Sequence, residues 1–274
     1  MPFRNRKVFI TGASRGIGKA IALKLAASGA QIAVASKSVV EDPRLGGTIY
    51  SAVEEIEKAG GKGLAIQLDV RDEQASAAAI QQAAEHFGGL DILINNASAI
   101  NLSPAAKLDP KRYDLMHDIN ARGTFFLCQA AIPFLRKSLR AHILNLSPPI
   151  NMNPQWFSKH LAYTMSKYNM SMIAYGLAAE LKEDRIAANS LWPKTTIATA
   201  AVNNLLGGEM LMRLSRKPEI VADAAALILQ KDPADCTGNF FLVEDVLASH
   251  GITNLSEYAF VEGNTNFYND LFLD

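Results

Sequence analysis

The segment TGASRGIG, residues 11–18, joins a strand-like run to a helix and decides the fold of this chain. Gly12 permits a sharp turn, Gly16 lets a phosphate approach the backbone, and Gly18 lets the helix pack close to the sheet. Free backbone N–H groups and the positive end of the helix dipole favour a pyrophosphate at such a junction. The segment therefore predicts the first βα turn of a dinucleotide-binding domain, with an ordinary glycine-rich turn as the alternative.

On both sides of this turn, short β-rich runs alternate with longer stretches of helical periodicity. Strands are predicted over residues 8–11, 31–36, 63–68, 91–95, 141–147, 186–192 and 239–243. Helices are predicted over residues 16–28, 48–59, 73–87, 111–137, 161–183 and 219–230, with Pro133 as a kink or boundary. Repeated βα units imply a parallel sheet with helices on both faces. We expect an α/β protein with one domain over residues 1–274, a Rossmann-type doubly wound parallel sheet of about seven strands.

The composition excludes several classes of function. The chain has 274 residues with 27 basic and 27 acidic side chains, and this neutral balance gives no indication of a nucleic-acid partner. No apolar run approaches the ~20 residues that a membrane-spanning helix needs. Cys128 and Cys236 show no metal-ligand spacing, so we expect reduced thiols, no metal site and a cytoplasmic location.

The residues after the second strand bear on cofactor choice. An acidic residue there would hydrogen-bond the ribose 2′-hydroxyl and repel a 2′-phosphate. This chain instead has Ser36-Lys37, with no acid before Glu41, and Arg15 lies within the glycine segment. Two cations around that corner favour a phosphate, so the sequence predicts NADP(H) rather than NAD(H). The alternative is that Lys37 is only a solvated surface lysine.

A tyrosine and a lysine lie four residues apart in Tyr163-Thr164-Met165-Ser166-Lys167, which places both on one face of a helix. A free phenol has a pKa of about 10, and a nearby cation lowers it toward a range useful for proton transfer. Ser147 ends the fifth predicted strand, at the sheet edge where ligands of open α/β folds bind. Taken alone, the tyrosine–lysine spacing is common in any helix.

Together these motifs resemble the short-chain dehydrogenase/reductase family, in the family's order across roughly residues 7–195. TGxxxGIG matches at every fixed position, and Asp69-Val70 and Asn95-Asn96-Ala97-Ser98 resemble two further cofactor motifs. The resemblance implies an oxidoreductase that interconverts a carbonyl and an alcohol. It implies Tyr163 as acid and base, Lys167 as its tuning group and ribose anchor, Ser147 as the group that polarises the carbonyl, and Asn120 as support for a proton relay.

The same resemblance implies a set of cofactor-binding residues: Thr11, Gly12, Ser14, Arg15, Gly16, Ile17, Gly18, Lys37, Asp69, Val70, Asn96, Ala97, Ser98, Tyr163, Lys167 and Pro193. We expect Asn95 to tie neighbouring strands together rather than to take part in chemistry. The nicotinamide contact after Pro193 falls on Thr195, Thr196 or Thr199.

Two stretches depart from the family pattern, in addition to Pro193-Lys194, which stands where the family usually has Pro-Gly. Pro148-Pro149 follows Ser147 directly and the spacing to Tyr163 is longer than usual, so we expect residues 148–160, with Trp156 and Phe157, to shape the substrate pocket. Residues 37–47 are also atypical and could reach over the adenosine end. Apolar residues in 148–160 and 196–216 suit a lipid- or steroid-like carbonyl, or else belong to the core or a subunit contact.

Stretches at 143–149, 191–195 and 272–274 narrow the resemblance to the hydroxysteroid dehydrogenase-like branch, whose animal members carry an additional sterol-carrier domain for which this sequence has no room. Family members are usually dimers or tetramers, so we expect a homodimer or homotetramer, with the apolar 271–273 stretch as a possible subunit contact. Two other functions stay open, a non-catalytic NADP-binding redox sensor and an epimerase on the same fold. The catalytic set argues against the sensor, because binding alone needs no proton donor.

Overall fold

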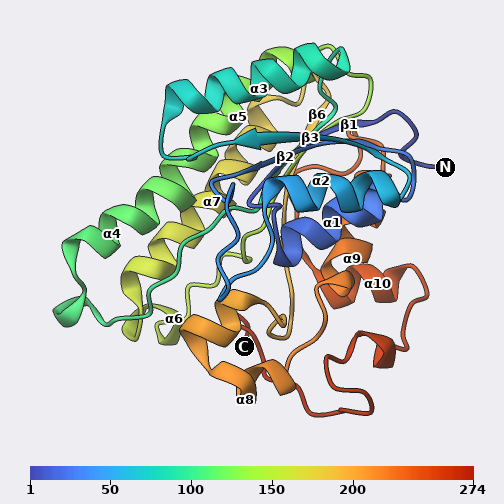
Figure 1. Cartoon of the computed structure of the whole chain (residues 1–274). Coiled ribbons are helices and arrows are strands. Elements are labelled where there is room, and N and C mark those ends of the chain that lie inside the picture. The colour runs from blue at the N-terminus through green and yellow to red at the C-terminus, as the bar shows by residue number, and fades with distance from the viewer.

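The computed structural model describes residues 1–274 and contains a seven-stranded, fully parallel sheet (Figure 1). The strands are β1 (Lys7–Thr11), β2 (Gln31–Ser36), β3 (Lys62–Gln67), β4 (Ile92–Asn95), β5 (Ala141–Asn145), β6 (Ile186–Trp192) and β7 (Phe240–Leu242). Their order is β3-β2-β1-β4-β5-β6-β7. The predicted fold class is confirmed.

Helices cover both faces of this sheet (Figure 1). They are α1 (Gly16–Ala26), α2 (Ile49–Lys58), α3 (Glu73–Phe87), α4 (Pro110–Met116), α5 (Thr124–Leu135), α6 (Gln155–Ser158), α7 (Leu161–Glu180), α8 (Gly208–Arg213), α9 (Glu219–Leu229) and α10 (Val243–Ser249). α1, α2, α9 and α10 pack together on one face, and α3, α5 and α7 pack on the other. None of these helices is both long and apolar enough to span a membrane.

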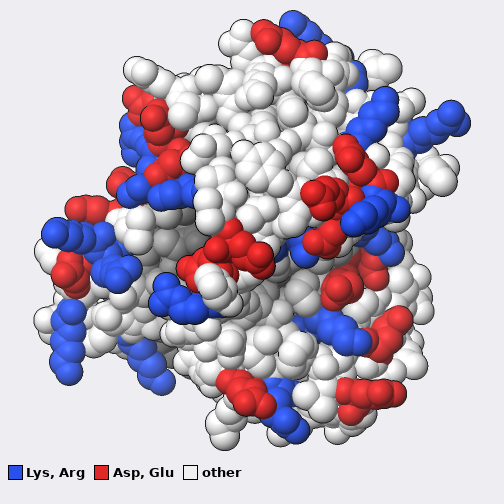
Figure 2. All heavy atoms as spheres, in the orientation of Figure 1, with Lys and Arg blue, Asp and Glu red and all other residues white.

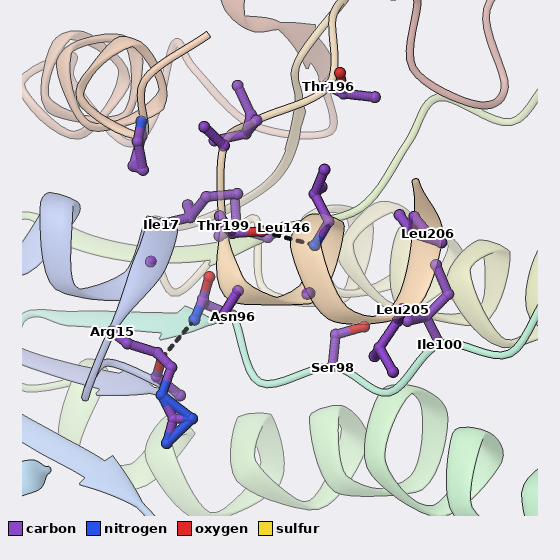
Figure 3. A pocket seen from close by; sticks show the side chains of 18 of the residues that line it. Arg15, Ile17, Asn96, Ser98, Ile100, Leu146, Thr196, Thr199, Leu205 and Leu206 are labelled. Carbon is purple, nitrogen blue, oxygen red and sulfur yellow. Dashed lines mark hydrogen bonds between the residues drawn. The ribbon is translucent and has the colours of Figure 1, made fainter. Parts of the chain in front are cut away.

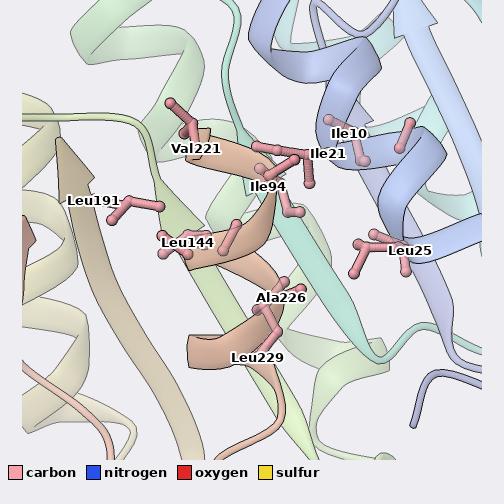
Figure 4. Packing of buried hydrophobic residues seen from close by; sticks show 14 of the residues in the cluster. Ile10, Ile21, Leu25, Ile94, Leu144, Leu191, Val221, Ala226 and Leu229 are labelled. Atoms are coloured by element: carbon pink, nitrogen blue, oxygen red, sulfur yellow. The ribbon is translucent and has the colours of Figure 1, made fainter. Parts of the chain in front are cut away.

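The larger core lies between the sheet and the α1–α9 face. Inward side chains of the strands, among them Ile10, Ile94 and Leu144, pack against α1 and α9 (Figure 4). The strand sequences are nearly continuous apolar runs, because strands of a parallel sheet are buried on both faces. Charged side chains of both signs are interspersed over the face shown in Figure 2, in keeping with the neutral composition.

The strand order reverses between β1 and β4. β1 pairs with β2 on one side and with β4 on the other, so the two chain segments that leave β1 and β4 depart in opposite directions. A crevice opens beyond the carboxyl ends of the strands at such a reversal, and ligands bind there in open α/β sheets. The glycine segment follows β1 and the 95–98 motif follows β4, so both flank this crevice.

Several elements differ from their predicted form. The helix expected over residues 111–137 begins at Pro110 and contains a wider, π-helical turn at His117–Gly123. Pro133 neither ends nor interrupts it, because α5 continues to Leu135. The sequence prediction also missed α6, α8 and α10, which are short and arise where tertiary contacts order a loop.

One buried histidine in the core makes the stability of the folded state depend on pH below neutrality. His142 lies in β5, the strand between β4 and β6, and its side chain is inaccessible to solvent. Burial, with a smaller effect of the Arg6 charge, lowers the pKa of His142 to about 4. An unfolded histidine has a pKa near 6.5, so the unfolded chain binds the proton first as the pH falls. The folded state therefore loses stability between about pH 6.5 and pH 4.

We expect His142→Gln, in which residue 142 cannot titrate, to reduce the dependence of the free energy of unfolding on pH. Wild type should lose up to about 3 kcal/mol more than the variant between pH 7 and pH 4, measured by urea unfolding at each pH. His86→Gln is the matched control, because His86 is exposed on α3 and should keep the wild-type slope. An unchanged slope in the His142 variant would show that this histidine does not govern acid stability.

Candidate active site

A cavity of about 1210 Å³ runs along the carboxyl edge of the sheet. The glycine segment lines one end, and Tyr163 and Lys167 of α7 line the other. Figure 3 shows Arg15 and Asn96 toward the first end, with Ile100, Leu205 and Leu206 across the cavity from them. This volume exceeds the roughly 300–1,000 Å³ of a typical small-ligand pocket, so the cavity has room for more than one ligand.

A hydrogen-bonded clasp joins the ends of β1 and β4. Thr11 Oγ1 accepts hydrogen bonds from the backbone N–H groups of Asn96 and Ala97, each at 3.0 Å. Asn96 Nδ2 donates to the backbone oxygens of Thr11 at 2.9 Å and Gly12 at 3.1 Å. The Asn96 side chain thereby fixes the shape of the glycine segment, and its role in cofactor binding stays a prediction.

Two glycines of the segment have no substitute at their positions. Gly12 has a φ of +65°, in the left-handed region that favours glycine. At Gly18 an added Cβ would lie 2.5 Å from Asn96 Nδ2 and 2.8 Å from the Gly12 oxygen. Since that Nδ2 is held by the clasp, it cannot move aside. The glycine pattern is therefore a packing requirement of the clasp as well as an opening for a ligand.

Arg15 and Lys37 both line the cavity near the end of β2. Arg15 Nε donates to the Gly46 oxygen at 3.0 Å, and its guanidinium also hydrogen-bonds Ser38, which folds the 37–47 segment over the glycine segment. Lys37 Nζ lies 3.2 Å from Asp69 Oδ2. Arg15 and Lys37 therefore both lie near the carboxyl end of β2. Each already interacts with a neighbouring group, Arg15 with the Gly46 oxygen and Lys37 with the Asp69 carboxylate.

The carboxylate of Asp69 lies between two cations. Arg71 Nη2 approaches Asp69 Oδ2 at 2.6 Å, and Lys37 approaches from the other side. Hydrogen bonds from Arg71, followed by those from Lys37, hold the pKa of Asp69 well below its usual range despite partial burial. Asp69 and Val70 line the cavity as predicted, with the Asp69 charge partly neutralised.

Tyr163 and Lys167 meet the expectation that they share one site. Their side chains are 4% and 2% exposed, and both line the cavity. Lys167 Nζ donates to the Leu146 oxygen at 2.6 Å and lies 5.1 Å from the centre of the Trp192 ring. No protein group within hydrogen-bonding distance accepts from or donates to the Tyr163 hydroxyl, which leaves it available to a ligand.

Burial dominates the electrostatics of this pair. It lowers the pKa of Lys167 to about 7, because the ammonium loses its hydration. It raises the pKa of Tyr163 above the ordinary phenol value, and the Asp270 carboxylate raises it further. The lowering of the tyrosine pKa that the sequence predicted is thus not found in this arrangement, because burial disfavours the phenolate.

Ser147 and Asn120 lie behind the cavity wall. Ser147 is inaccessible to solvent and its Oγ donates to Ser190 Oγ at 3.0 Å, so the structure does not place it beside Tyr163 on the cavity surface. Asn120, on the π-helical turn, exchanges hydrogen bonds with the Ala99 backbone at 2.8 and 2.9 Å and donates to Ser166 Oγ at 3.0 Å. Their roles in polarisation and proton relay stay predictions.

Other predicted residues divide between the wall and the core. Asn95 Nδ2 donates to Asn145 Oδ1 at 2.9 Å, which ties β4 to β5 as expected. Of the three threonines after Pro193, Thr196 and Thr199 line the cavity. Thr195 does not, and its hydroxyl lies 3.4 Å from Glu244 Oε1.

The apolar end of the cavity is built by residues after β6. Leu205 and Met210 are 65% and 76% exposed, and they line the cavity with neighbours from Ala198 to Leu214. The prediction that residues 148–160 would shape this pocket is wrong, because none of them lines it. Trp156 and Phe157 instead pack in the aromatic cluster around Phe272, which also contains Tyr163.

Residues 268–271 line the cavity, which the sequence did not reveal. Tyr268, Asn269, Asp270 and Leu271 line the cavity, and Phe272 is fully buried in the same chain. The alternative that this apolar stretch is a subunit contact is therefore wrong for Phe272. In the sequence, residues 272–274 contributed only to the family resemblance, which says nothing about where the segment folds.

Comparison with known proteins agrees with this geometry. The short chain dehydrogenase family profile matches residues 6–208. Hydroxysteroid dehydrogenase-like protein 2 of Homo sapiens is 54% identical over 267 residues, which are 97% of this chain. The match covers 63% of the human protein, so this chain spans less than two thirds of that relative's length.

Solved structures show the same fold. A short chain dehydrogenase from Mycobacterium thermoresistibile has a TM-score of 0.93 and 50% identity, covering 99% of this chain and 96% of that one. A metagenomic short-chain oxidoreductase in complex with NADP has a TM-score of 0.71 and 25% identity, covering 88% of this chain and 98% of that one. A dehydrogenase from Mycobacterium paratuberculosis bound to NAD, at 24% identity and a TM-score of 0.74, shares the fold over 88% of this chain and 97% of that one.

We expect Gly18→Ala to damage both stability and dinucleotide binding. The new methyl group would force the Asn96 clasp apart, which should lower the free energy of unfolding by about 1–3 kcal/mol. Affinity for NADPH, followed by fluorescence titration, should fall about tenfold or more. Gly176→Ala in α7 is the control, because no neighbouring atom lies within 4 Å of its added Cβ. Full NADPH affinity in the Gly18 variant would contradict the packing argument.

Proposed function

The chain belongs to the short-chain dehydrogenase/reductase family of NAD(P)-dependent oxidoreductases, and from that premise we propose that it uses NADP(H) to interconvert a carbonyl and an alcohol. One observation carries the proposal. The glycine segment and the Tyr163–Lys167 pair, far apart in the sequence, line a single cavity at the strand-order reversal. A dinucleotide bound along this edge would present its nicotinamide end near the tyrosine hydroxyl.

The residues present fit such a dinucleotide. The glycine segment leaves backbone N–H groups at the start of α1, where a pyrophosphate is favoured. Asp69, Val70, Ala97 and Ser98 line the wall between the two ends. When bound, the cofactor supplies or accepts the hydride at the substrate carbon.

The protein's own part in the reaction is to move one proton. In reduction, the Tyr163 hydroxyl gives its proton to the carbonyl oxygen as the carbon gains hydride. In oxidation, the phenolate takes the proton of the alcohol. Lys167, as an ammonium, favours the phenolate and would hold the nicotinamide ribose. Water is limited near these groups because both side chains are almost fully buried.

The lining supports an apolar carbonyl or alcohol, of lipid- or steroid-like character, as the substrate. Six apolar residues between Leu205 and Leu214 contribute to the apolar wall. Exposed apolar residues at Phe125 of α5 and at Met172 and Tyr175 of α7 support a homodimer or homotetramer. The two buried, unpaired cysteines support a cytoplasmic location.

A second function has one observation in its favour. Ser147 hydrogen-bonds Ser190 behind the wall, so the arrangement lacks the expected polarising hydroxyl in the cavity. A non-catalytic NADP-binding redox sensor would need no such group. Binding of NADPH without turnover of any ketone, aldehyde or alcohol in a broad panel would favour the sensor.

Tyr163→Phe tests the proton-transfer role. The variant loses only the hydroxyl, which makes no hydrogen bond to the protein, so it should fold and bind NADPH with wild-type affinity. We expect kcat to fall at least about 100-fold, in line with the usual contribution of general acid–base catalysis. Tyr175→Phe on the same helix is the control, because Tyr175 lies outside the cavity. Retained turnover would remove Tyr163 from this role.

Cofactor preference is tested by comparing kcat/KM for NADPH and NADH. Wild type should prefer NADPH, and Lys37→Ala should reduce that preference by about tenfold, the effect of one charge-assisted phosphate contact. Lys58→Ala on α2 is the matched control, since Lys58 does not line the cavity. A wild-type preference for NADH would overturn the choice of NADP(H).

A further inference from the structure

We propose that Asp270 is a positioning residue for the catalytic pair, because its carboxylate stabilises the Lys167 ammonium and the protonated Tyr163. The site is thereby held ready to give a proton to a carbonyl oxygen near neutral pH. This inference rests on the proposed oxidoreductase function and adds a residue from outside the glycine and tyrosine–lysine motifs.

Backbone hydrogen bonds fasten the 268–271 stretch to the segment that follows β6. The Thr196 N–H donates to the Tyr268 oxygen at 2.9 Å, and the Asp270 N–H donates to the Lys194 oxygen at 2.9 Å. Thr195 and Asn269 form an antiparallel bridge between these contacts. The two segments therefore form a short ladder along the cavity wall, which fixes the backbone position of Asp270.

Phe272 anchors the other side of Asp270. Its ring lies 6.0 Å from the ring of Tyr163 and 5.3 Å from that of Tyr168, and it is fully buried. Trp192 Nε1 donates to the Leu271 oxygen at 3.1 Å. Phe272 has a φ of +75°, an unusual conformation for a bulky residue, which the surrounding aromatic packing sustains. Asp270 is thus held between the backbone hydrogen bonds to residues 194–196 and the buried ring of Phe272.

Asp270 is the acidic residue at the catalytic end of the cavity. Two other acids line the cavity, and Asp69 is already paired with Lys37 and Arg71, while Glu219 begins α9. The Asp270 carboxylate has no cation within 4 Å, and its Oδ1 accepts only the Leu271 N–H, at 2.8 Å. Lys167 lies nearby in the fold, because Trp192 contacts the Lys167 ammonium with its ring and donates a hydrogen bond to the Leu271 oxygen.

Other charged groups near Asp270 are engaged elsewhere. Glu244 of α10 accepts the Lys194 backbone N–H at 2.8 Å and lies 4.0 Å from Arg216. The Lys194 ammonium pairs with Asp245 on the outside. Glu244 acts on Asp270 as a like charge, so it raises the pKa of Asp270 and does not replace Lys167 as its partner.

Coulomb interactions between these buried groups favour one charge state. Burial raises the pKa of Asp270 to about 7, and the Lys167 charge opposes that rise. The Asp270 charge in turn opposes the lowering of the Lys167 pKa by burial and raises the pKa of Tyr163. With Asp270 ionised, Lys167 keeps its proton and the neutral phenol is favoured over phenolate.

Asp270→Asn tests the proposal, because it removes the charge and keeps the size of the side chain. In protein labelled with [ε-13C]lysine, the Lys167 resonance, assigned with Lys167→Arg, should titrate about one pH unit lower in the variant than in wild type. This NMR readout needs no substrate or cofactor. Asp270→Ala is a second variant that should give the same shift, and Asp270→Glu should restore the wild-type titration.

The functional readout is the pH profile of kcat/KM for NADPH-dependent reduction of phenanthrenequinone, an apolar diketone. Loss of activity at high pH should begin about one unit lower in Asp270→Asn, because Lys167 loses its proton earlier. Asp235→Asn is charge-matched and exposed near the amino end of β7, so it should leave both titrations unchanged. An unchanged Lys167 titration in Asp270→Asn and Asp270→Ala would overturn the inference. Absence of turnover in wild type would count against the proposed function and leave the NMR test intact.

Discussion

The clasp between Thr11 and Asn96 is the interaction on which the rest of the site depends. It joins the carboxyl ends of β1 and β4 at the one place where the strand order reverses. Because the Asn96 amide is bound to the backbone of the glycine segment, there is no room for a side chain at Gly18. The turn, the start of α1 and the near end of the cavity thus follow from a single set of hydrogen bonds.

At the other end of the cavity, the free-energy cost of burying charge governs the protonation states of Lys167 and Tyr163. Lys167 is enclosed by the Leu146 oxygen, the Met170 sulfur and the Trp192 ring, with no carboxylate at hydrogen-bonding distance. An ammonium in such a place loses its proton more easily than in water. A negative charge at Asp270 therefore favours the state in which Lys167 is an ammonium and Tyr163 a phenol. The same burial strengthens any hydrogen bond that Tyr163 makes to a substrate.

The segments around the cavity make contacts with different parts of the structure. The 37–47 stretch folds over the glycine segment through Arg15, and Asn204 donates to the Arg44 oxygen at 3.0 Å, so it meets the apolar segment after β6. Residues 148–160 serve the aromatic cluster instead, where Tyr168 donates to the Asn151 oxygen at 2.6 Å. The residues after β6 therefore line the cavity, and the 148–160 loop supports the helix that carries the tyrosine.

The sequence by itself determined the sheet, its parallel order of βα units, the glycine turn and the placement of Tyr163 and Lys167 on one helix face. These follow from local periodicity, from glycine geometry and from the topology that repeated βα units impose. Only the tertiary structure decided that Ser147 turns to Ser190, that the π-helical turn orients Asn120 toward Ala99 and Ser166, and that Asp270 reaches the cavity. Those outcomes depend on contacts between residues up to 79 positions apart, such as Trp192 with Leu271. No local pattern specifies such pairs, because the same short stretch is compatible with many packing partners until the core has formed.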